Sequence, residues 1–367
     1  MPVKDLHELP FSEETITKLE IFEDYLEAWI PTFVMPGFQD IYIYDFFAGR
    51  GYDITGVAGS PIRILKSIEK FLGHILTKKT RVHVLLNEYN QDKYNLLLKN
   101  VNSFLGSNPK FEYFLKVNIH NEKFEDLFPK VESELKLGPN LIFLDQNGIK
   151  QFSDNTFLKF VEFEKTDFLT FISSSYFTRF AKDKGFRKHI AVDIGEIDKN
   201  PYKYIHEVIL NHFKSLIPIG NEIKLYPFSL KKGKNIYGLI FGSKHIRGVD
   251  KFLSIAWDKN RINGVANFDI DGELPKDSQQ FTLTFSEFVK QTKLDKFREE
   301  LKEFILGDIL VNNLDVYIYT LEKGFTTKHS IELIKELKKK NLIYYKGQTK
   351  INYKSYKEKI IVNYEKN

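Results

Sequence analysis

Short runs of apolar residues alternate along the chain with longer stretches in which apolar residues recur every three or four positions. The short runs end at polar residues and are predicted to be β-strands; they cover residues 41–44, 82–86, 113–117, 141–144 and 168–172. The stretches between them have the spacing of helices. Fully apolar strands separated by helices are typical of a parallel sheet that is buried on both faces. The pattern therefore predicts a doubly wound, Rossmann-like α/β domain.

Segments on either side extend this domain. A helix is expected to begin at the capping residue Ser12 and to end at Pro31. After a helix near residues 202–216, two strand candidates over residues 223–228 and 236–241 are separated by a turn. An antiparallel pair at the edge of a parallel sheet is the addition found in the methyltransferase type of this fold, which so far is an analogy of fold alone.

The last quarter of the chain is predicted to be mainly helical, with helices over residues 294–310 and 314–321. Thr326 and Thr327 cap a third helix, and the apolar segments 342–345 and 351–353 that follow it suggest a β-hairpin. Helices followed by a capped helix and a hairpin indicate a winged helix. We therefore expect three parts, an N-terminal helical segment (1–36), a Rossmann-like methyltransferase-type domain (37–275) and a helical and winged-helix-like domain (276–367).

Composition narrows the possible chemistry. The 367 residues include no cysteine, which excludes disulfides, thiolate metal sites and a cysteine nucleophile. The polar start of the chain lacks the features of a signal peptide, and no apolar run approaches the roughly 18 residues of a membrane span. We therefore expect a cytoplasmic protein without a membrane segment. No His-x-x-x-His spacing occurs, so no metal site is expected.

The net charge of +5 is unevenly placed. From Leu321 onward, 12 Lys and no Arg face 5 Glu, a net charge of +7, so the preceding 320 residues carry −2. A basic C-terminal module suits contact with DNA or RNA. The candidate contacts are Lys335, Lys338 and Lys339 on or beside the capped helix and Lys346 in the hairpin turn. A solvated helix face, or a surface that docks a protein, would explain the same lysines.

Polar residues end the predicted strands of the sheet. Asp45 ends the first strand and leads into Gly49 and Gly51, where the missing Cβ atoms allow backbone N–H groups to approach a carboxylate or phosphate. Glu88 follows the second strand, where an acid accepts the ribose hydroxyls of an adenosine-containing cofactor. A tight turn and a solvated carboxylate are the simpler explanations of each feature alone.

Two further candidates follow the third and fourth strands. Asn118 is placed near the end of the third strand, where an amide would bind an adenine edge or only form a loop. Asp145 ends the fourth strand and would lie beside the transferred group. Because the carboxyl ends of parallel strands meet at one edge of a sheet, all these residues are expected to share one crevice.

Several motifs together resemble the three-Cys-motif partner family, from the N-terminal helix to about residue 357. They are YDFFAGRG, GSPIRIL, LLNE and NLIFLDQNG, with the winged-helix-like end. The resemblance implies a methyltransferase-like Rossmann fold, S-adenosylmethionine as cofactor and a separate three-cysteine-motif protein, of radical-S-adenosylmethionine type, as partner. It implies a role for each matching residue: Asp45, Phe47, Gly49 and Gly51 in the cofactor loop, Glu88 as the ribose-binding acid and Asp145 at the reacting face.

The chain departs from the family at two places. Arg50 replaces a proline, and Gln146-Asn147 replaces a proline and an aromatic residue. Amino-methyltransferases of this fold use such a Pro-aromatic motif to grip a flipped base. Two functions therefore remain open, a methyltransferase in which Asp145 orients or deprotonates the acceptor and an adaptor that binds nucleic acid or its partner without methyl transfer. A Mg²⁺ nuclease is a third, although no lysine follows Asp145 in the usual acid-x-Lys spacing.

Overall fold

The computed structural model describes residues 10–146, 152–173, 205–232, 235–270 and 291–366. The chain forms two compact units, residues 1–245 and residues 246–367, which are described separately below. The domain boundary that we expected at residues 275/276 falls in 271–290, outside the described residues.

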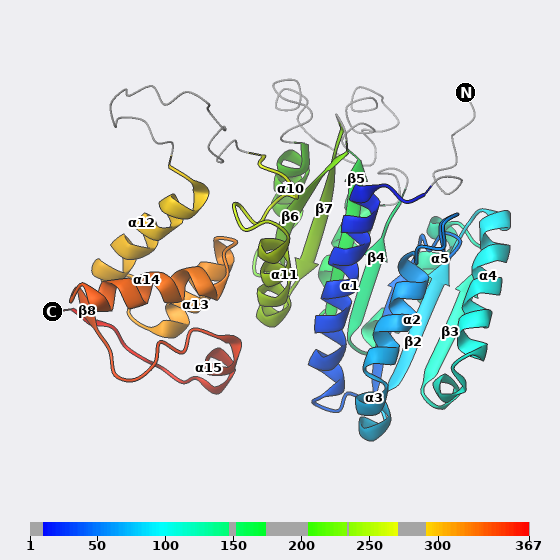
Figure 1. The fold of residues 1–367 in the computed structure, drawn as a ribbon, viewed down its shortest axis with the longest axis horizontal. Helices are drawn as coiled ribbons and strands as arrows, with labels where there is room; N and C mark the ends of the chain where they lie inside the picture. Colours follow the sequence, from blue (N-terminus) through cyan, green and yellow to red (C-terminus); the bar gives the residue numbers. More distant parts are fainter. Residues whose placement is uncertain (1–9, 147–151, 174–204, 233–234, 271–290, 367) are drawn as a thin grey trace. The chain divides into compact units, whose positions relative to one another are not determined.

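The first unit is an α/β sandwich (Figure 1). Its strands are β1 (Asp40–Asp45), β2 (Arg81–Asn87), β3 (Leu115–His120), β4 (Asn140–Leu144), β5 (Thr166–Ser173), β6 (Lys224–Lys232) and β7 (Asn235–Ser243). Its helices are α1 (Glu13–Val34), α2 (Ser60–Lys70), α3 (Leu72–Lys78), α4 (Gln91–Gly106), α5 (Phe124–Val131), α6 (Asp154–Glu162) and α10 (Ile205–Leu216), with 3₁₀ turns η2 (Pro109–Tyr113) and η3 (Glu134–Lys136).

The strand order identifies the type of sheet. Within the described residues the order is β3-β2-β1-β4-β5-β7-β6. The first five strands run parallel, and β7 pairs antiparallel with both β5 and β6. A parallel sheet closed by an antiparallel hairpin is the arrangement of Rossmann-like methyltransferases. The predicted fold class and the predicted edge hairpin are thus confirmed.

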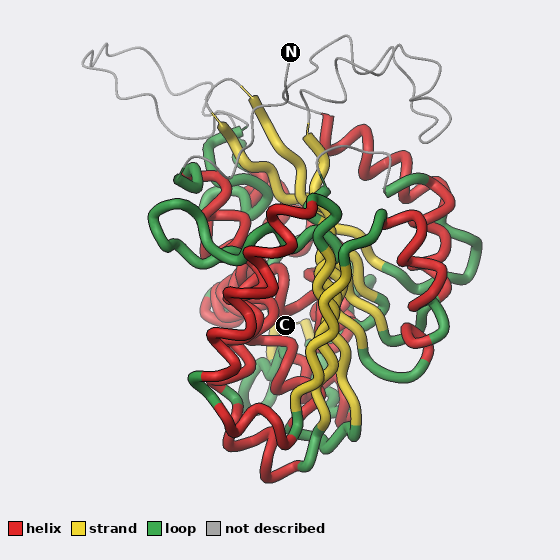
Figure 2. Tube along the Cα trace, turned by 90° about the vertical axis from the view of Figure 1, so that its right-hand side faces the viewer, coloured by secondary structure: helices red, strands yellow, loops and turns green. Residues whose placement is uncertain are grey.

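Helices cover both faces of this sheet (Figure 2). On one face α1 packs against β4, where Phe22 and Phe143 stack with ring centroids 4.1 Å apart, and α2 lies beside α1. On the other face α5, α6 and α10 enclose an aromatic core that includes Phe157, Phe168 and Phe213. Each fully buried side chain of this kind stabilises the fold by about 2 kcal/mol. Burial on both faces explains the continuous apolar runs of the central strands β1 and β4.

Two predicted boundaries in this unit were wrong. Helix α1 continues through Pro31 to Val34. Pro31 removes only one backbone donor, and the full burial of Ile30 and Val34 on either side of it outweighs that loss. Strand β3 begins and ends later than expected, at Leu115 and His120 rather than near residues 113 and 118. The chain before it forms η2, which buries Phe111.

The second unit is a small helical domain with a two-stranded sheet. Its elements are α11 (Ile246–Lys259), α12 (Lys293–Leu306), α13 (Asn313–Glu322), α14 (Thr327–Lys339), β8 (Ile343–Tyr344), α15 (Tyr353–Glu358) and β9 (Glu365–Lys366). Its core includes Phe297 and Phe325, which stack with centroids 4.0 Å apart. The Trp257 indole N–H donates to the carbonyl of Gly324 at 2.9 Å, at the turn before α14.

The predicted hairpin after α14 was wrong in its second strand. β8 pairs with β9 and not with residues 351–353. Asn352 instead caps α15, because its side chain accepts the N–H of Ser355 at 2.9 Å. The chain between β8 and β9 therefore contains a helix. No helix among the described residues is both long and apolar enough to cross a membrane.

Candidate active site

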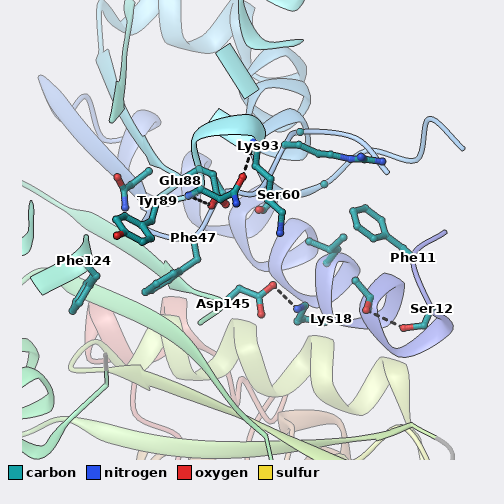
Figure 3. A pocket seen from close by; sticks show the side chains of 18 of the residues that line it. Phe11, Ser12, Lys18, Phe47, Ser60, Glu88, Tyr89, Lys93, Phe124 and Asp145 are labelled. Carbon is teal, nitrogen blue, oxygen red and sulfur yellow. Dashed lines mark hydrogen bonds and ion pairs between the residues drawn. The ribbon is translucent and has the colours of Figure 1, made fainter. Parts of the chain in front are cut away.

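A cavity of about 740 Å³ opens at the carboxyl ends of β1, β2 and β4 (Figure 3). Residues from these strand ends, from the loop before α2 and from the start of α1 line it. The lining includes Phe11, Ser12, Thr15, Lys18, Phe47, Gly51, Ser60, Glu88, Tyr89, Phe124 and Asp145. Four of the predicted site residues, Phe47, Gly51, Glu88 and Asp145, thus lie around one cavity, as the meeting of parallel strand ends requires.

Asp45 lies behind the cavity wall as a fully buried carboxyl group. Its Oδ1 accepts the N–H of Phe47 at 3.2 Å, whereas its Oδ2 has no hydrogen-bond partner among the described residues. Burial raises the pKa of Asp45 to about 7, and the negative charges of Asp145 and Glu88 act in the same direction. The Ser60 hydroxyl and the Phe47 N–H oppose this rise of the pKa.

The loop after β1 requires its glycines. Gly49 and Gly51 have φ angles of +65° and +96°, a region that favours glycine. A Cβ atom on Gly51 would also lie 3.3 Å from the Cβ of Asn100 in α4, whose Nδ2 donates to the carbonyl of Arg50 at 2.8 Å. The sequence alone did not indicate Asn100 as the residue that holds this loop.

Ser60 is the first residue of α2 and not its N-cap. Gly59 is the N-cap of α2, and the Gly59 N–H donates to the carbonyl of Gly51 at 2.7 Å. Ser60 is buried at the first position of the helix, where its hydroxyl lowers the pKa of Asp45. The loop from Gly51 to Ser60 therefore brings a second polar group to the buried carboxyl.

Glu88 stands at the rim of the cavity, where its Oε1 accepts the N–H of Asn90 at 2.8 Å. Asn87 beside it is buried and joins three strand ends. Its Nδ2 donates to the carbonyls of Phe46 at 3.2 Å and Glu122 at 3.0 Å, and its Oδ1 accepts the N–H of Glu122 at 3.1 Å. Sequence reasoning missed Asn87, although a polar residue closing an apolar strand was a usable signal.

Asn118 lies apart from the other candidate residues. It is inside β3 and lines a separate cleft of about 180 Å³ with Tyr44 and Glu134. Asn121, beyond the end of β3, instead supports the backbone at the end of β2. Its Nδ2 donates to the carbonyls of Glu88 at 2.7 Å and Tyr89 at 2.9 Å. Asn118 lies away from the cavity because β3 ends later than predicted, which places Asn118 inside the strand.

Asp145 lines the cavity at the end of β4 and forms an ion pair with Lys18 of α1. The Lys18 ammonium also lies 4.7 Å from the ring centroid of Phe171. Gln146 is buried, and its Nε2 donates to the Phe171 carbonyl at 2.8 Å and to Thr170 Oγ1 at 3.2 Å. The side chain after Asp145 is thus bound to β5. Asn147 lies outside the described residues.

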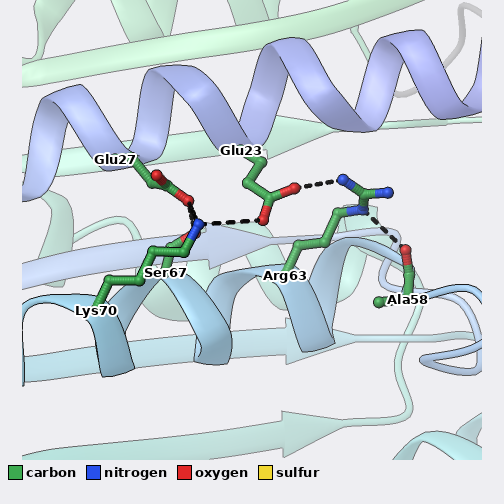
Figure 4. A network of polar contacts seen from close by, with 6 residues as sticks. All are labelled: Glu23, Glu27, Ala58, Arg63, Ser67 and Lys70. Carbon is green, nitrogen blue, oxygen red and sulfur yellow. Dashed lines mark hydrogen bonds and ion pairs between the residues drawn. The ribbon is translucent and has the colours of Figure 1, made fainter.

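The start of α1 is part of the site, which the sequence did not predict. The Phe11 N–H donates to Asp53 Oδ2 at 2.8 Å, so the loop after β1 holds the segment before the helix. Further along, Arg63 and Lys70 of α2 form ion pairs with Glu23 and Glu27 of α1 (Figure 4). The only signal in the sequence was a polar face on a helix that otherwise carries a core-facing apolar stripe.

The four candidate lysines of the second unit differ in their surroundings. Lys335, Lys339 and Lys346 are exposed. Lys338 is half-buried, because its Nζ donates to the carbonyl of Tyr345 at 2.8 Å and lies 4.0 Å from the centroid of that ring. Lys338 therefore fastens α14 to the end of β8.

In the described part of the chain, no group of three or more histidine or acidic side chains is arranged to hold a metal ion.

Comparisons with known proteins identify the C-terminal domain most clearly. Residues 267–350 match the model of the GMT-like wHTH domain. A putative methyltransferase, yhhF from Escherichia coli, is 13% identical with a TM-score of 0.28, over 67% of this chain and 92% of that chain. The METTL16 methyltransferase domain is 11% identical with a TM-score of 0.31, over 65% and 70%. A search of curated proteins found no match. By its strand order and its matched domain, the chain combines a methyltransferase-type α/β sheet with a C-terminal winged helix-turn-helix domain.

Proposed function

We propose that the first unit binds S-adenosylmethionine in the 740 Å³ cavity and transfers its methyl group. The meeting of Gly51, Glu88 and Asp145 around one cavity carries this proposal, because the ends of three strands of a methyltransferase-type sheet converge there. Asp45 lies behind this wall and supports the loop, because its Oδ1 accepts the N–H of Phe47.

The surrounding residues fit the rest of the cofactor. The volume lies within the range of about 300–1,000 Å³ that small-molecule sites occupy. Backbone at Gly51 can approach the amino acid end closely, and Glu88 at the rim can accept both ribose hydroxyls. Tyr89, whose side chain is exposed beside Glu88, offers a ring face for the adenine.

Side chains of the protein would position the acceptor at the end of the cavity where the methyl group is transferred. The bound cofactor supplies an electrophilic methyl group on a sulfonium. Asp145 at the tip of β4 can accept a hydrogen bond or a proton from the acceptor group, and Phe47 and Phe124 on the cavity wall keep water away from it. Phe47 and Phe124 stack with centroids 5.7 Å apart, so this wall is continuous.

Calorimetry tests the cofactor assignment. We expect wild-type protein to bind S-adenosylmethionine, Glu88→Ala to weaken binding at least about tenfold because two ribose hydrogen bonds are removed, and Glu69→Ala on the exposed side of α2 to leave it unchanged. Absence of binding in the wild type, or equal binding by all three proteins, would reject the cofactor.

We further propose that the protein acts on nucleic acid and works with a three-cysteine-motif protein. The winged helix-turn-helix domain and the exposed Lys335, Lys339 and Lys346 support the first part. The resemblance in the strand-end motifs supports the second. Duplex DNA and RNA binding that weakens with added salt, and co-purification of the two proteins at a fixed ratio, are the expected results.

An adaptor without methyl transfer is the second candidate. Gln146 favours it, because the side chain that follows Asp145 is buried against β5 and offers no ring to a base. The two candidates differ in one result. Binding of S-adenosylmethionine without conversion to S-adenosylhomocysteine, in the presence of the partner and of nucleic acid, would identify the adaptor.

A further inference from the structure

The reacting end of the cavity carries one acidic and one basic side chain in contact. Lys18 and Asp145 both line the cavity and form an ion pair, with side chains 14% and 28% exposed. Lys18 contacts Asp145 through Oδ2, so Oδ1 remains for another donor. An ammonium has three donors and no acceptor, whereas a carboxylate only accepts. The site therefore offers a donor and an acceptor side by side.

Other contacts also hold α1 in place. The Phe11 N–H is bound by Asp53, and Arg63 and Lys70 bind the acidic side chains of α1 farther along the helix (Figure 4). These contacts fasten the helix on both sides of Lys18. The Lys18 ammonium, set between Asp145 and the face of Phe171, is thus available for a role in the cavity.

The donor and acceptor pair distinguishes between classes of methyl acceptor. A hydroxyl group has one proton and two lone pairs, so it can donate to Asp145, accept from Lys18 and keep a lone pair for the methyl group. An exocyclic amine on a base offers two N–H donors and needs two acceptors. It also gains positive charge as it attacks the methyl group, which a neighbouring ammonium opposes. Gln146 is not among the residues that line the cavity, and its Nε2 is bound to β5, so the charge of Lys18 is the feature that distinguishes the two classes of acceptor.

We infer that the acceptor methylated by this site is a hydroxyl group, with Asp145 as base and Lys18 as donor to the reacting oxygen. This rests on the proposed function. The hydroxyl oxygen forms a bond to the methyl carbon while the bond from that carbon to sulfur breaks, and the hydroxyl proton passes to Asp145 and then to water. The products are a methyl ether and S-adenosylhomocysteine. Lys18 stays protonated and stabilises the negative charge that develops on oxygen.

Product chemistry tests the class of acceptor. The full chain, with its partner, is incubated with S-adenosylmethionine labelled in the methyl group and with total RNA, DNA or a protein extract as separate acceptors. We expect the label in an alkali-stable methyl ether on RNA ribose or on a hydroxyl side chain, and these two arms identify the source of the hydroxyl. Label on DNA bases or in any methylamine would overturn the inference and leave the proposed function standing. No label in any fraction would overturn both.

A binding measurement tests the placement of the pair without turnover. Calorimetry compares S-adenosylmethionine, which carries a positive sulfonium, with neutral S-adenosylhomocysteine. Lys18→Met leaves the Asp145 charge unpaired beside the sulfonium, so we expect the preference for S-adenosylmethionine to rise about three- to tenfold. Asp145→Asn should lower the same ratio. Lys93→Met removes an equal charge elsewhere on the cavity wall and should leave the ratio unchanged.

Two results would overturn the assignment of Lys18 and Asp145 to the reacting end. One is an unchanged ratio in both variants while both ligands still bind, and the other is a ratio that Lys93→Met changes as much as Lys18→Met. The first would show that neither charge faces the sulfonium, and the second that the effect does not depend on the position of the charge. Because both ligands report on the same protein sample, a partly unfolded variant lowers the binding stoichiometry and not the ratio.

Discussion

Lys18 and Asp145 form an ion pair at the cavity although 127 positions separate them in the sequence. The contact joins the first helix of the chain to the end of β4. Residues that precede the sheet therefore belong to the candidate active site and do not only cover its face. Their variants should change ligand binding as well as stability.

Asp45 should make the stability of the first unit depend on pH. Burial raises its pKa from 3.8 to about 7, so the folded state holds the proton more tightly than the unfolded state. The stabilisation is complete below about pH 4 and is lost as the pH rises to about 7. Asp45→Asn removes this pH dependence. In urea unfolding without ligand, the fall in stability between pH 4 and pH 8 should shrink by about 2–4 kcal/mol.

Asp167 shares this direction, because burial raises its pKa to about 6, and it therefore remains as a smaller pH-dependent contribution in the Asp45→Asn protein. A control variant, Asp167→Asn, should remove that smaller part alone. Identical pH profiles for the wild type and Asp45→Asn would mean that the Asp45 carboxyl is ionised in the folded protein throughout.

The ion pairs between α1 and α2 should contribute unequally. Arg63 and Glu23 are 13% and 20% exposed, and the Arg63 Nε also donates to the carbonyl of Ala58 at 2.9 Å. Arg63→Met should cost about 1–2 kcal/mol, because it leaves a partly buried carboxylate and a carbonyl without their donor. Lys70 is 54% exposed, so Lys70→Met should cost less than about 0.5 kcal/mol. Urea unfolding compares them, and equal costs would contradict this order.

Asn313 should hold the C-terminal segment in the second unit. It is fully buried, donates to the carbonyls of Lys350 and Ile360 at 3.0 Å each, and accepts the N–H of Val362 at 2.7 Å. Asn313→Ala leaves three backbone groups without a partner and should destabilise this unit by about 2–4 kcal/mol. Hydrogen exchange over residues 343–366 should accelerate accordingly.

Asn352 provides the matched control for that experiment. It caps α15 from an exposed position, so Asn352→Ala should cost about 1 kcal/mol and speed exchange only within α15. If Asn313→Ala affected exchange no more widely than this control, the chain between β8 and β9 would be held by other contacts.

The lysines of α14 should separate nucleic-acid binding from stability. The double variant Lys335→Ala, Lys339→Ala should weaken binding to duplex DNA or RNA without changing the unfolding temperature. The slope of log K against log salt should fall by up to about 0.9 for each phosphate that the variant no longer neutralises. Lys338→Met should instead lower the unfolding temperature, because it removes the hydrogen bond to the Tyr345 carbonyl. An unchanged salt slope in the double variant would contradict phosphate contacts by these two lysines and would favour a role in protein docking.

The sequence could predict the sheet because burial of a strand on both faces produces a short run of apolar residues in the sequence. The runs that precede Asp45 and Asp145 are continuous, the run that precedes Glu88 is interrupted by His83 and Asn87, and parallel strands between helices place such ends at one edge. The Gly49 and Gly51 turn after β1 could be anticipated from the glycines themselves, whereas their positive φ angles are a result of the structure. The winged helix could be anticipated from its capped helix.

Other features depended on contacts between distant segments. The pairing of β8 with β9, instead of with residues 351–353, follows from Asn313 and Asn352, whose amide groups bind backbone that the local pattern does not identify. Asn118 was misplaced because η2 delays the start of β3.

Local pattern thus determined which segments are strands and helices, which ends carry acids, and where the basic charge lies, because each depends on periodicity and composition within a short stretch. The tertiary structure alone decided that Asp45 is buried with a free oxygen and that Lys18 meets Asp145. Burial and ion pairing are set by packing between residues far apart in the chain. A sequence pattern places Lys18 on a helix, and only the packing of that helix on the sheet places its charge in the cavity.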